Sequence, residues 1–385
     1  MNKLKVGVIF GSRSTEHDIS VVTAIASIIK PLELSGRYEV IAIYIDKKGN
    51  WYSDPKLKDI NLFSSGEIDN WLKRNRPIQL GIGEGLSLIK PGLAKKPLKI
   101  DVVFPATHGT HGEDGELMGL LEMANVAYVG CDMPSSALAM DKALAKIVAS
   151  ESNIPSTKYV WFYAKDFADD AKKVLKRLAG LRYPLFVKPV HLGSSIAITR
   201  VKSETELKNA IEVAAHYDNK VIVEEEVQNL IEATVPVIGN DKLIPALVEQ
   251  PVTHDDDFFD FETKYMAGGK KGKGGKTNGS QGYSRLPADL PKDLMDQAEK
   301  TALDVYRALG CSGIARVDLL VDTKAKKVYF NEVNPLPGSL YAHNWRAAGR
   351  SNVELVEELV KLALDKHEDK QALNTVFDTN YLKQY

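Results

Sequence analysis

The chain has 385 residues, with 50 Lys and Arg against 51 Asp and Glu, which gives a formal net charge of -1. This length is sufficient for two or three domains with sizeable cores. The near-zero charge argues against a general nucleic-acid-binding protein, and no stretch approaches the ~18 consecutive apolar residues that a membrane helix needs. The two cysteines, Cys131 and Cys311, cannot form a disulfide framework or a Cys-rich zinc site, so we expect a soluble protein of a reducing compartment.

The N-terminal part of the sequence alternates between strand and helix patterns. Residues 5–10 form a β-branched run that predicts a first strand rather than a signal peptide, and an amphipathic helix is predicted over about residues 17–30. A second strand is predicted over residues 38–45, and this order is typical of a parallel, doubly wound sheet. Residues 51–99 are poorly periodic and rich in Gly, Lys and Pro, so we expect an elaborated loop region there. Residues 100–105 predict another strand.

The pattern changes at about Ser135, where an Ala- and Leu-rich segment begins. It predicts one helix that has Ser135 as its N-cap and ends before Pro155. Short strands and a helix follow, with strands over residues 158–162, 185–188, 196–200 and 220–224 and a helix over about residues 204–216. The final third predicts a helix near residues 291–309, a pair of strands over residues 315–322 and 326–333, and a closing helix with a capping box at Ser351 and Glu354.

The predicted strand pair carries oxygen ligands on one face. Because alternate side chains of a strand share a face, Glu332 and Asn334 point the same way, as do Arg316 and Asp318. A hairpin between the strands would bring Asp318, Glu332 and Asn334 together, and carboxylate and amide oxygens suit Mg²⁺ that is held jointly with substrate phosphates. The alternative is an ordinary salt-bridged hairpin face.

Two other segments have the composition of a nucleotide site. Lys188 precedes the small residues Gly193, Ser194 and Ser195, which would let backbone N–H groups approach phosphate oxygens beside a fixed positive charge. This is not the P-loop pattern, and most such segments are only turns. The acidic run near Glu224 offers a strand edge to an adenine, or it is a solvated acidic edge.

The segment THGTHGEDGE, which starts at Thr107, contains two His, three acids and three Gly. Its histidines lack the helical spacing of a zinc-protease motif. A strand-end loop at the carboxyl edge of an open sheet, where such folds bind ligands, is the better interpretation.

Taken in order, the chain contains FGSRSTEHDIS, HGTHGEDGE, AMDKALAK, FVKPVHLGSS, VEEEVQNLIEATV, FDFETKY, ARVDLL and NEVNPLPG. This ordered set resembles the D-alanine–D-alanine ligase family of the ATP-grasp superfamily over about residues 5–365. The resemblance implies an α/β fold with an N-terminal Rossmann-like substrate domain over residues 1–130. It also implies a two-lobed ATP-grasp fold, with a central lobe over residues 131–224 and a C-terminal lobe over residues 225–385 that carries the metal and acceptor sites.

The resemblance implies ATP and two Mg²⁺ ions, or Mn²⁺, as cofactors. The expected phosphate-binding residues are Lys142, Lys188, Ser194 and Ser195. The expected adenine- and ribose-binding residues are Glu225, Glu226, Val227, Gln228 and Glu232. The expected metal ligands are Asp318, Glu332 and Asn334.

The resemblance also implies how the amino-acid substrates are held. Glu16 would hold the ammonium of the first amino acid, and His108 would lie by the phosphoryl group with Glu113 nearby. Arg316 and the backbone N–H of Gly338 would stabilise a tetrahedral oxyanion.

A loop that closes over the site is implied by three positions of the sequence. Glu16, Ser194 and Tyr265 match the hydrogen-bonded triad of the family, and Lys264 belongs to the same loop. Tyr265 favours an amine as the acceptor, since relatives that make D-alanyl-D-lactate lack this residue.

Two stretches depart from the family pattern. Pro335 replaces a Thr, and His343 falls at the position expected for a Ser that binds the second carboxylate, with Asn344 taking this place if one residue is inserted. Trp345 adds bulk that would reshape the pocket; the alternative is that the stretch repacks without chemical effect. The Gly- and Lys-rich stretch over residues 266–282 is longer than the family's loop, and we expect it to be mobile and solvated.

The implied activity is the ATP-dependent ligation of two D-alanines to D-alanyl-D-alanine through an acyl phosphate, for peptidoglycan synthesis. We expect a cytoplasmic homodimer with D-alanine and ATP as small-molecule substrates, and no nucleic-acid or membrane partner. One alternative is a related ligase with a different acceptor. Another is a nucleotide-binding pseudo-enzyme, which would have lost one of its lysines or metal ligands.

Overall fold

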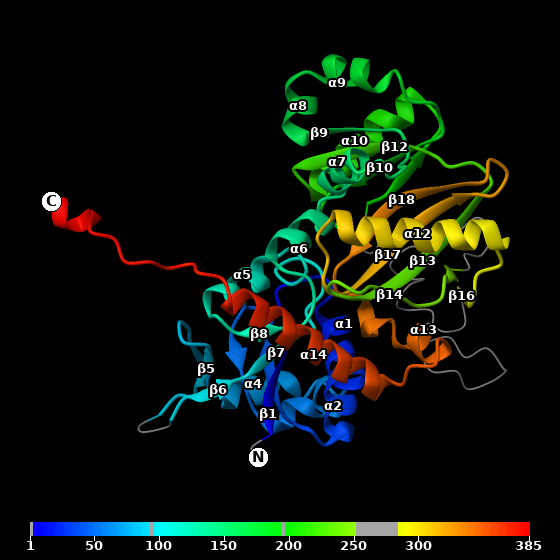
Figure 1. Ribbon diagram of the computed structural model, residues 1–385. Helices are drawn as coiled ribbons and strands as arrows, with labels where there is room; N and C mark the ends of the chain where they lie inside the picture. The colour runs from blue at the N-terminus through cyan, green and yellow to red at the C-terminus, as the bar shows by residue number, and fades with distance from the viewer. Residues whose placement is uncertain (1–2, 93–95, 194–196, 252–283) are drawn as a thin grey trace.

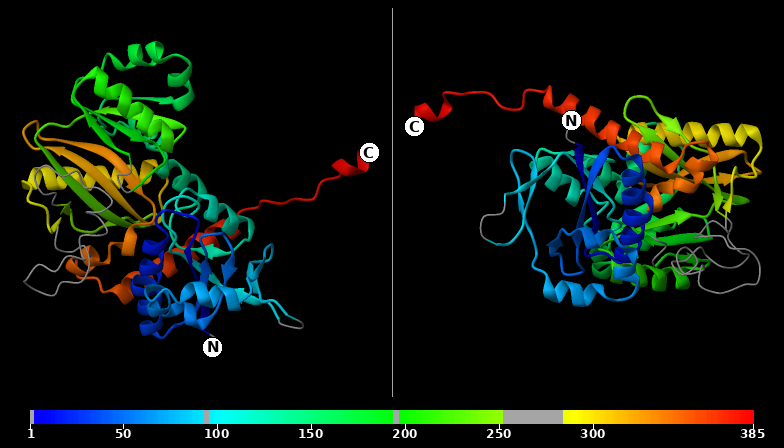
Figure 2. Two further views of the ribbon diagram at one scale, coloured as in Figure 1. Left: turned by 180° about the vertical axis from the view of Figure 1, so that it is seen from behind. Right: turned by 90° about the horizontal axis from the view of Figure 1, so that it is seen from below.

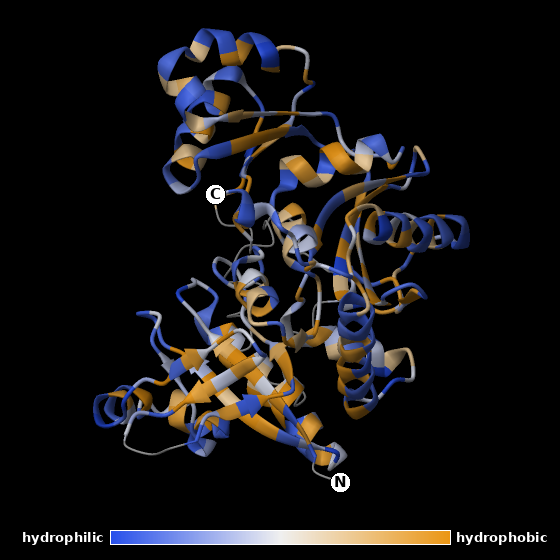
Figure 3. Cartoon of the chain, turned by 60° about the vertical axis from the view of Figure 1, so that its left-hand side comes forward, coloured by the Kyte–Doolittle hydropathy of each residue, from blue (hydrophilic) through white to orange (hydrophobic). Residues whose placement is uncertain are grey.

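The computed structural model describes residues 3–92, 96–193, 197–251 and 284–385 of the chain. Three main sheets, each with its own helices, build the molecule (Figure 1). The sheet near the N-terminus is largely apolar along its strands, whereas the surrounding helices carry both apolar and polar residues (Figure 3). No helix in these described ranges is long and apolar enough to cross a membrane.

The first sheet has five strands in the order β3-β2-β1-β7-β8. Its strands are β1 (Leu4–Gly11), β2 (Tyr38–Ile45), β3 (Trp51–Tyr52), β7 (Val102–Pro105) and β8 (Ala127–Tyr128). β1 runs parallel to both β2 and β7, and β7 runs parallel to β8, while β3 joins the edge antiparallel. The prediction of a doubly wound parallel sheet is therefore confirmed.

The first helical segment is longer than predicted. It consists of α1 (His17–Val22), the π-helical η1 (Thr23–Ile29) and α2 (Lys30–Ser35). Gly36 ends it in the left-handed conformation, with φ of 68°. Its buried face, which includes Ile25, Ile28 and Ile29, packs into the core of the first sheet.

The prediction of an elaborated loop over residues 51–99 is wrong. In addition to β3, this region contains η2 (Pro55–Lys58), α3 (Ile60–Ser64), α4 (Ile68–Arg74), β4 (Gln79–Gly81), β5 (Leu86–Ile89) and β6 (Leu98–Ile100). β4, β5 and β6 form a small antiparallel sheet, and Leu86 and Leu88 are buried against the first sheet. Elements this short contain too few residues to show a clear period, so burial against the sheet rather than local pattern stabilises them.

The single helix predicted from Ser135 is two helices, and its predicted cap is wrong. α5 (Glu116–Met123) precedes them, and they are α6 (Met133–Met140) and α7 (Lys142–Glu151). Asp132 caps α6, since its carboxylate accepts from the N–H of Ser135. Asp141 is extended, and its carboxylate accepts from the N–H groups of Ala143 and Leu144. Asp141 thereby ends one helix and starts the next, because it competes for backbone donors.

The second sheet is antiparallel in the order β11-β10-β12-β9. Its strands are β9 (Tyr159–Tyr163), β10 (Leu185–Pro189), β11 (Thr199–Val201) and β12 (Lys220–Glu225), and its helices are α8 (Ala164–Asp169), α9 (Ala171–Leu178) and α10 (Glu204–Tyr217). The strand predicted over residues 196–200 is found at Thr199–Val201, and residue 196 lies outside the described residues.

The third sheet has the order β14-β13-β17-β18 and is also antiparallel. Its strands are β13 (Leu230–Gly239), β14 (Ile244–Pro245), β17 (Gly313–Asp322) and β18 (Lys327–Asn334), with β15 (Gln250–Pro251) and β16 (Ser284–Arg285) paired beside them. α12 (Lys292–Ala308) covers one face. The chain then forms η5 (Gly338–Tyr341), α13 (Ala342–Ala347), α14 (Asn352–Gln371) and η6 (Tyr381–Gln384).

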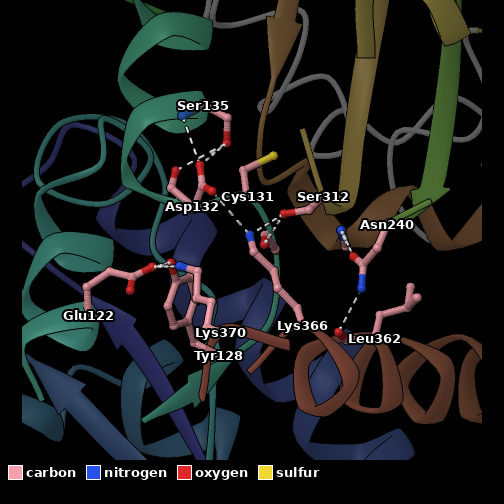
Figure 4. A network of polar contacts seen from close by, with 12 residues as sticks. Glu122, Tyr128, Cys131, Asp132, Ser135, Asn240, Ser312, Leu362, Lys366 and Lys370 are labelled. Atoms are coloured by element: carbon pink, nitrogen blue, oxygen red, sulfur yellow. Dashed lines mark hydrogen bonds and ion pairs between the residues drawn. The ribbon is translucent and has the colours of Figure 1, made fainter. Parts of the chain in front are cut away.

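The closing helix α14 begins with the predicted capping box of Ser351 and Glu354. It returns to the first sheet, and Figure 4 shows the polar contacts at this junction. Lys370 bonds to Glu122, and the Lys366 amine lies 3.5 Å from an oxygen of Asp132. The residues after α14 extend away from the body (Figures 1 and 2). The C-terminal helix thus joins the third sheet to the N-terminal part of the molecule.

Candidate active site

The hairpin of β17 and β18 carries the predicted oxygen ligands in the predicted register. Asp318 pairs with Glu332 and Arg316 pairs with Asn334, and a bulge follows directly after Asp318. All four side chains are partly exposed on this face. The hairpin therefore brings two carboxylates and an amide to one place, as expected from the alternation of side chains along a strand.

Asp318 is held by two neighbours. Arg316 donates from Nε at 2.8 Å and from Nη2 at 2.6 Å to its two carboxylate oxygens, and the Thr234 hydroxyl donates to Oδ1 at 3.0 Å. Such a two-pronged pair fixes the plane of the carboxylate. Arg316 thus lies directly beside a candidate metal ligand.

Glu332 lies where the hairpin meets helix α7. The Lys142 amine is 3.1 Å from Glu332 Oε2 and donates to the Leu192 carbonyl at 2.8 Å. Asn334 accepts a bond from the Leu336 N–H at 3.1 Å. A predicted phosphate-binding lysine and a predicted metal ligand are therefore in direct contact, although they are far apart in the sequence.

Lys188 belongs to a buried cluster that the sequence analysis missed. Its amine lies 2.9 Å from Glu224 Oε2, and the Lys146 amine lies 3.2 Å from Glu224 Oε1. Burial would raise the pKa of Glu224, but the two lysines outweigh it and lower the pKa to about 2. Burial lowers the pKa of Lys146. One signal was present in the sequence, because Lys146 lies one helical turn after Lys142 and so shares its face.

The predicted adenine segment follows this cluster along β12. Glu225 is buried and accepts from the Arg182 Nη2 at 2.9 Å, and Glu226 pairs with the Arg200 Nε at 2.6 Å. Val227 is buried, whereas Gln228 and Glu232 are exposed. Both acids at the start of this segment are therefore paired with arginines, and their backbone N–H groups donate to the carbonyls of Lys158 and Pro184.

The loop after β7 brings His108 and Glu113 together. The two are buried, with His108 Nδ1 3.5 Å from Glu113 Oε1, and Glu113 accepts from the Gly109 N–H at 2.8 Å. Burial would lower the pKa of His108, but the Glu113 carboxylate raises it above its usual value. The pKa of Glu113 is raised by burial.

Glu16 is buried where three loops meet. A Cβ at Gly109 would lie 3.3 Å from Glu16 Oε2, and one at Gly193 would lie 3.8 Å from Oε1. With φ of 69°, Gly109 also requires the conformation that glycine adopts most readily. The Glu16 carboxylate is thus beside both glycine loops that the sequence singled out.

The turn at Gly338 is tied to the first helical segment through Thr23. The Ser339 N–H donates to the Thr23 hydroxyl at 3.0 Å, and the same oxygen lies 2.9 Å from His108 Nε2. Ser339, Leu340 and Tyr341 have φ of 52°, 54° and 52°. Three consecutive non-glycine residues in the left-handed region are costly, so the surrounding contacts must hold this turn.

His343 and Asn344 follow this turn on α13, and both contact Glu249. His343 Nε2 lies 2.8 Å from Glu249 Oε2, and the Asn344 amide donates to the same oxygen at 3.0 Å. Asn344 is fully buried, and its amide also bonds both backbone groups of Leu247. Sequence reasoning missed Glu249, because nothing in its local pattern marks it.

Some of the predicted site residues lie outside the described residues. These are Ser194, Ser195, Lys264, Tyr265 and the Gly- and Lys-rich stretch over residues 266–282. Their roles stay predictions.

Among the described residues, one group of three side chains has the spacing of a metal site. It consists of His111, Asp114 and Glu116. The ring Nδ1 of His111 bonds to the Glu116 carboxylate, and the backbone N–H of His111 donates to the Asp114 carboxylate. Both hydrogen bonds are made within the segment from Thr107 to Glu116, in agreement with its interpretation as a strand-end loop.

The chain matches two family models, described as the D-ala D-ala ligase N-terminus over residues 5–131 and the D-ala D-ala ligase C-terminus over residues 148–361. It is 37% identical over 377 residues to the D-alanine--D-alanine ligase of Thermoanaerobacter sp. strain X514, covering 96% of this chain and 99% of the relative. The solved D-alanine-D-alanine ligase from Coxiella burnetii has a TM-score of 0.80 at 32% identity, with 96% of this chain and 97% of that chain covered. The VanG D-Ala:D-Ser ligase from Enterococcus faecalis has a TM-score of 0.75 at 32% identity, with 94% and 100% covered.

Proposed function

Since the chain belongs to the D-alanine–D-alanine ligase family, we propose that it joins two D-alanines to D-alanyl-D-alanine at the expense of ATP. The enzyme is an ATP-dependent ligase whose product serves peptidoglycan synthesis. A ligase for a different acceptor is not favoured, because relatives that match over nearly their full length at 36–37% identity are D-alanine--D-alanine ligases, whereas the D-Ala:D-Ser ligase is 32% identical. We further propose that it acts in the cytoplasm as a homodimer.

In this proposal, ATP lies between the second and third sheets. Lys142 and Lys188 hold its phosphates, with Ser194 and Ser195 covering them, and the edge from Glu225 to Gln228 receives the adenine. Glu232 takes the ribose hydroxyls. The contact of Lys142 with Glu332 supports this arrangement, since it brings a phosphate-binding cation beside a metal ligand.

The residues of the hairpin fit Mg²⁺. Asp318, Glu332 and Asn334 offer only oxygen donors, which hard divalent cations prefer, and the register sets them on one face. When bound, two such ions would offset the negative charge of the transferring phosphoryl group. Thr234 would orient Asp318 through its hydroxyl bond.

The remaining residues act on the amino acids. Glu16 holds the ammonium of the first D-alanine, whose carboxylate is converted to an acyl phosphate, and His108 lies near the transferred group. The amine of the second D-alanine then attacks the carbonyl carbon of the acyl phosphate, and the tetrahedral intermediate expels inorganic phosphate and loses the amine proton to leave the peptide bond. Arg316 and the backbone N–H of Gly338 stabilise the resulting oxyanion, while Tyr265 and Lys264 close the site against water.

The observation that carries this proposal is the 3.1 Å contact between the Lys142 amine and Glu332 Oε2. The proposal is tested by incubating the protein with ATP, Mg²⁺ and a panel of D- and L-amino acids, including D-serine. We expect ADP release with D-alanine alone, with D-alanyl-D-alanine identified by mass and the reaction abolished by EDTA. ADP release only with a mixed pair would contradict the proposed acceptor, and no turnover with any pair would contradict the ligase assignment.

A further inference from the structure

The two cysteines of the chain meet where the N-terminal part of the molecule packs on the third sheet. Cys131 lies between β8 and α6, and Cys311 lies between α12 and β17. Both thiols are buried, with 0% and 7% of the two residues exposed. The sequence contains no other cysteine, so a disulfide within one chain can join only these two residues. The proposed ligation uses neither thiol.

The backbone segments that carry the two cysteines touch each other. A Cβ at Gly313 would lie 2.8 Å from the Cα and the N atom of Gly130, so the contact has no room for a side chain. With φ of 67°, Gly313 also has the left-handed conformation that glycine adopts most readily. The Ser312 hydroxyl donates to the Gly130 carbonyl at 3.2 Å, and Cys131 Sγ lies 3.8 Å from the Ile314 carbonyl oxygen. The residues next to each cysteine are therefore already held together.

The surroundings of the pair favour a thiolate on Cys131. A hydrogen bond from the Cys311 thiol lowers the pKa of Cys131, and the Ser312 N–H and the Lys366 ammonium act in the same direction, against the effect of burial. The same contact raises the pKa of Cys311 well above its usual value. Lys366 is held at this place by Ser312 and Asp132 (Figure 4). Because the thiolate is the reactive form of a cysteine, Cys131 is the thiol that attacks an oxidant, and Cys311 is the thiol beside it.

We propose that Cys131 and Cys311 are a redox modification site, which hydrogen peroxide converts to a disulfide that joins the N-terminal part of the molecule to the third sheet. The Cys131 sulfur attacks one peroxide oxygen, the O–O bond breaks, and hydroxide leaves, which gives a sulfenic acid. The Cys311 sulfur then attacks the Cys131 sulfur and displaces the sulfenic oxygen as hydroxide. The two thiols lose two electrons, and their two protons convert both hydroxides to water.

The burial of the pair selects a small oxidant. Hydrogen peroxide has only two heavy atoms, whereas oxidised glutathione must bring a bulky disulfide onto the attacking sulfur, and thiol–disulfide exchange depends on access. The bond would close a loop over residues 131–311, which contains all four strands of the second sheet. Since a disulfide that closes a long loop restricts the unfolded chain strongly, oxidation should stabilise the fold.

The test uses the full-length protein, which is reduced with dithiothreitol, freed from the reductant and treated with hydrogen peroxide, or with oxidised glutathione in a parallel sample. Intact mass and non-reducing gel electrophoresis identify the product, and melting curves compare the oxidised with the reduced protein. Cys131→Ser and Cys311→Ser are treated in the same way with dimedone present, which traps a sulfenic acid. Each serine variant keeps one thiol and is the control for the other.

We expect peroxide to lower the mass of the wild type by about 2 Da without joining two chains, and dithiothreitol to restore it. The melting temperature of the oxidised protein should be about 3–10 °C higher than that of the reduced protein. Cys311→Ser should accumulate a sulfenic acid on Cys131 that dimedone traps, and Cys131→Ser should react at least about tenfold more slowly. Oxidised glutathione should leave both thiols free.

Other outcomes overturn the inference. A wild type that keeps both thiols in peroxide, or that forms a disulfide only between two chains, would show that the pair is not a modification site. If a serine variant does not fold, the mass of the wild type still decides this. Equal trapping in the two variants would remove Cys131 as the attacking thiol, and an unchanged melting temperature would show that the bond does not stabilise the junction. None of these outcomes depends on the ligase activity, so the proposed function is tested separately.

Discussion

Two buried glutamates, Glu224 and Glu249, lie on either side of the proposed site and are compensated in different ways. Glu224 lies between two ammonium groups, those of Lys146 and Lys188, at the core of the ATP side. Glu249 lies on the acceptor side, where its partners are the His343 ring, the Asn344 amide and the Ser284 side chain.

The two sides of the proposed site therefore differ in how firmly their buried carboxylates are held. The two lysines lower the pKa of Glu224 to about 2, so this side keeps one arrangement for a cosubstrate that does not vary. The acceptor side relies on a partly exposed histidine beside a turn of three left-handed residues. Such a site is more easily changed by substitution, which fits a region where the sequence departs from its family.

The largest effect is expected on the ATP side of the site, where a substitution of Glu224 should lower the free energy of unfolding. Glu224→Gln keeps the shape of the side chain but leaves two buried ammonium groups without their shared carboxylate, so we expect a loss of about 3–5 kcal/mol in the free energy of unfolding. Urea denaturation measures it. Asp296→Asn is the control at an exposed pair with Lys292 on α12, and it should cost no more than about 0.5 kcal/mol. Equal urea midpoints for Glu224→Gln and Asp296→Asn would show that the contacts of Glu224 do not stabilise the fold.

The second prediction concerns the hairpin between the two sides. Glu332→Gln removes a proposed metal ligand, and we expect kcat to fall by at least about 100-fold, the upper range for losing even an outer partner of a metal. The free energy of unfolding should change less than in Glu224→Gln, because the Glu332 side chain is 28% exposed. Asp322→Asn, at the far end of β17, is the matched control, with kcat unchanged. Turnover that survives in Glu332→Gln would remove Glu332 from the metal site.

The third prediction concerns the part of the acceptor side that is fixed. Asn344→Leu leaves the backbone groups of Leu247 and one oxygen of Glu249 without their partners, so we expect a loss of about 2–3 kcal/mol in the free energy of unfolding. Asn352→Ala, which breaks a surface bond to Arg346, is the control with little expected change. A small effect at Asn344 would mean that water replaces the amide and that this side is looser than its contacts indicate.

The smallest expected effect is a pH dependence of the free energy of unfolding that arises from His191, on the ATP side of the site. Hydrogen bonds to Asp141 and Asp218 raise the pKa of His191 to about 9. A raised pKa stabilises the fold below the unfolded value of about 6.5, and this stabilisation is lost as the pH rises to about 9. Because the side chain is 45% exposed, we expect no more than about 1 kcal/mol.

Melting temperatures of the wild type and of His191→Asn between these pH values measure this effect. The two curves should converge as the pH rises. Parallel curves would show that the ion pairs of His191 do not contribute to stability.

The sequence by itself determined the features that are encoded over a few residues. Runs of apolar and β-branched residues, and the alternation of side chains along the hairpin, predicted three strands of the first sheet and two of the third, but not the long strand β13. The capping box at Ser351 located the start of α14. The same alternation placed Asp318 and Glu332 opposite each other on one hairpin, because a strand repeats every two residues whatever surrounds it. The break of the predicted helix at Asp141 depends only on local hydrogen bonds, but the sequence analysis missed it. In the sequence, an Asp that caps a new helix looks the same as an Asp on the polar face of a continuous one.

Only the tertiary structure decided how the distant parts of the site meet. Glu249 and His343 are 94 residues apart in the sequence, and Thr23 and Ser339 are 316 apart. No local period links such positions, and an isolated glutamate or threonine in the sequence is the same whether it is solvated or buried. Their partners are set by how the sheets and helices pack, because burial requires each polar group to find a donor or acceptor wherever the fold brings one.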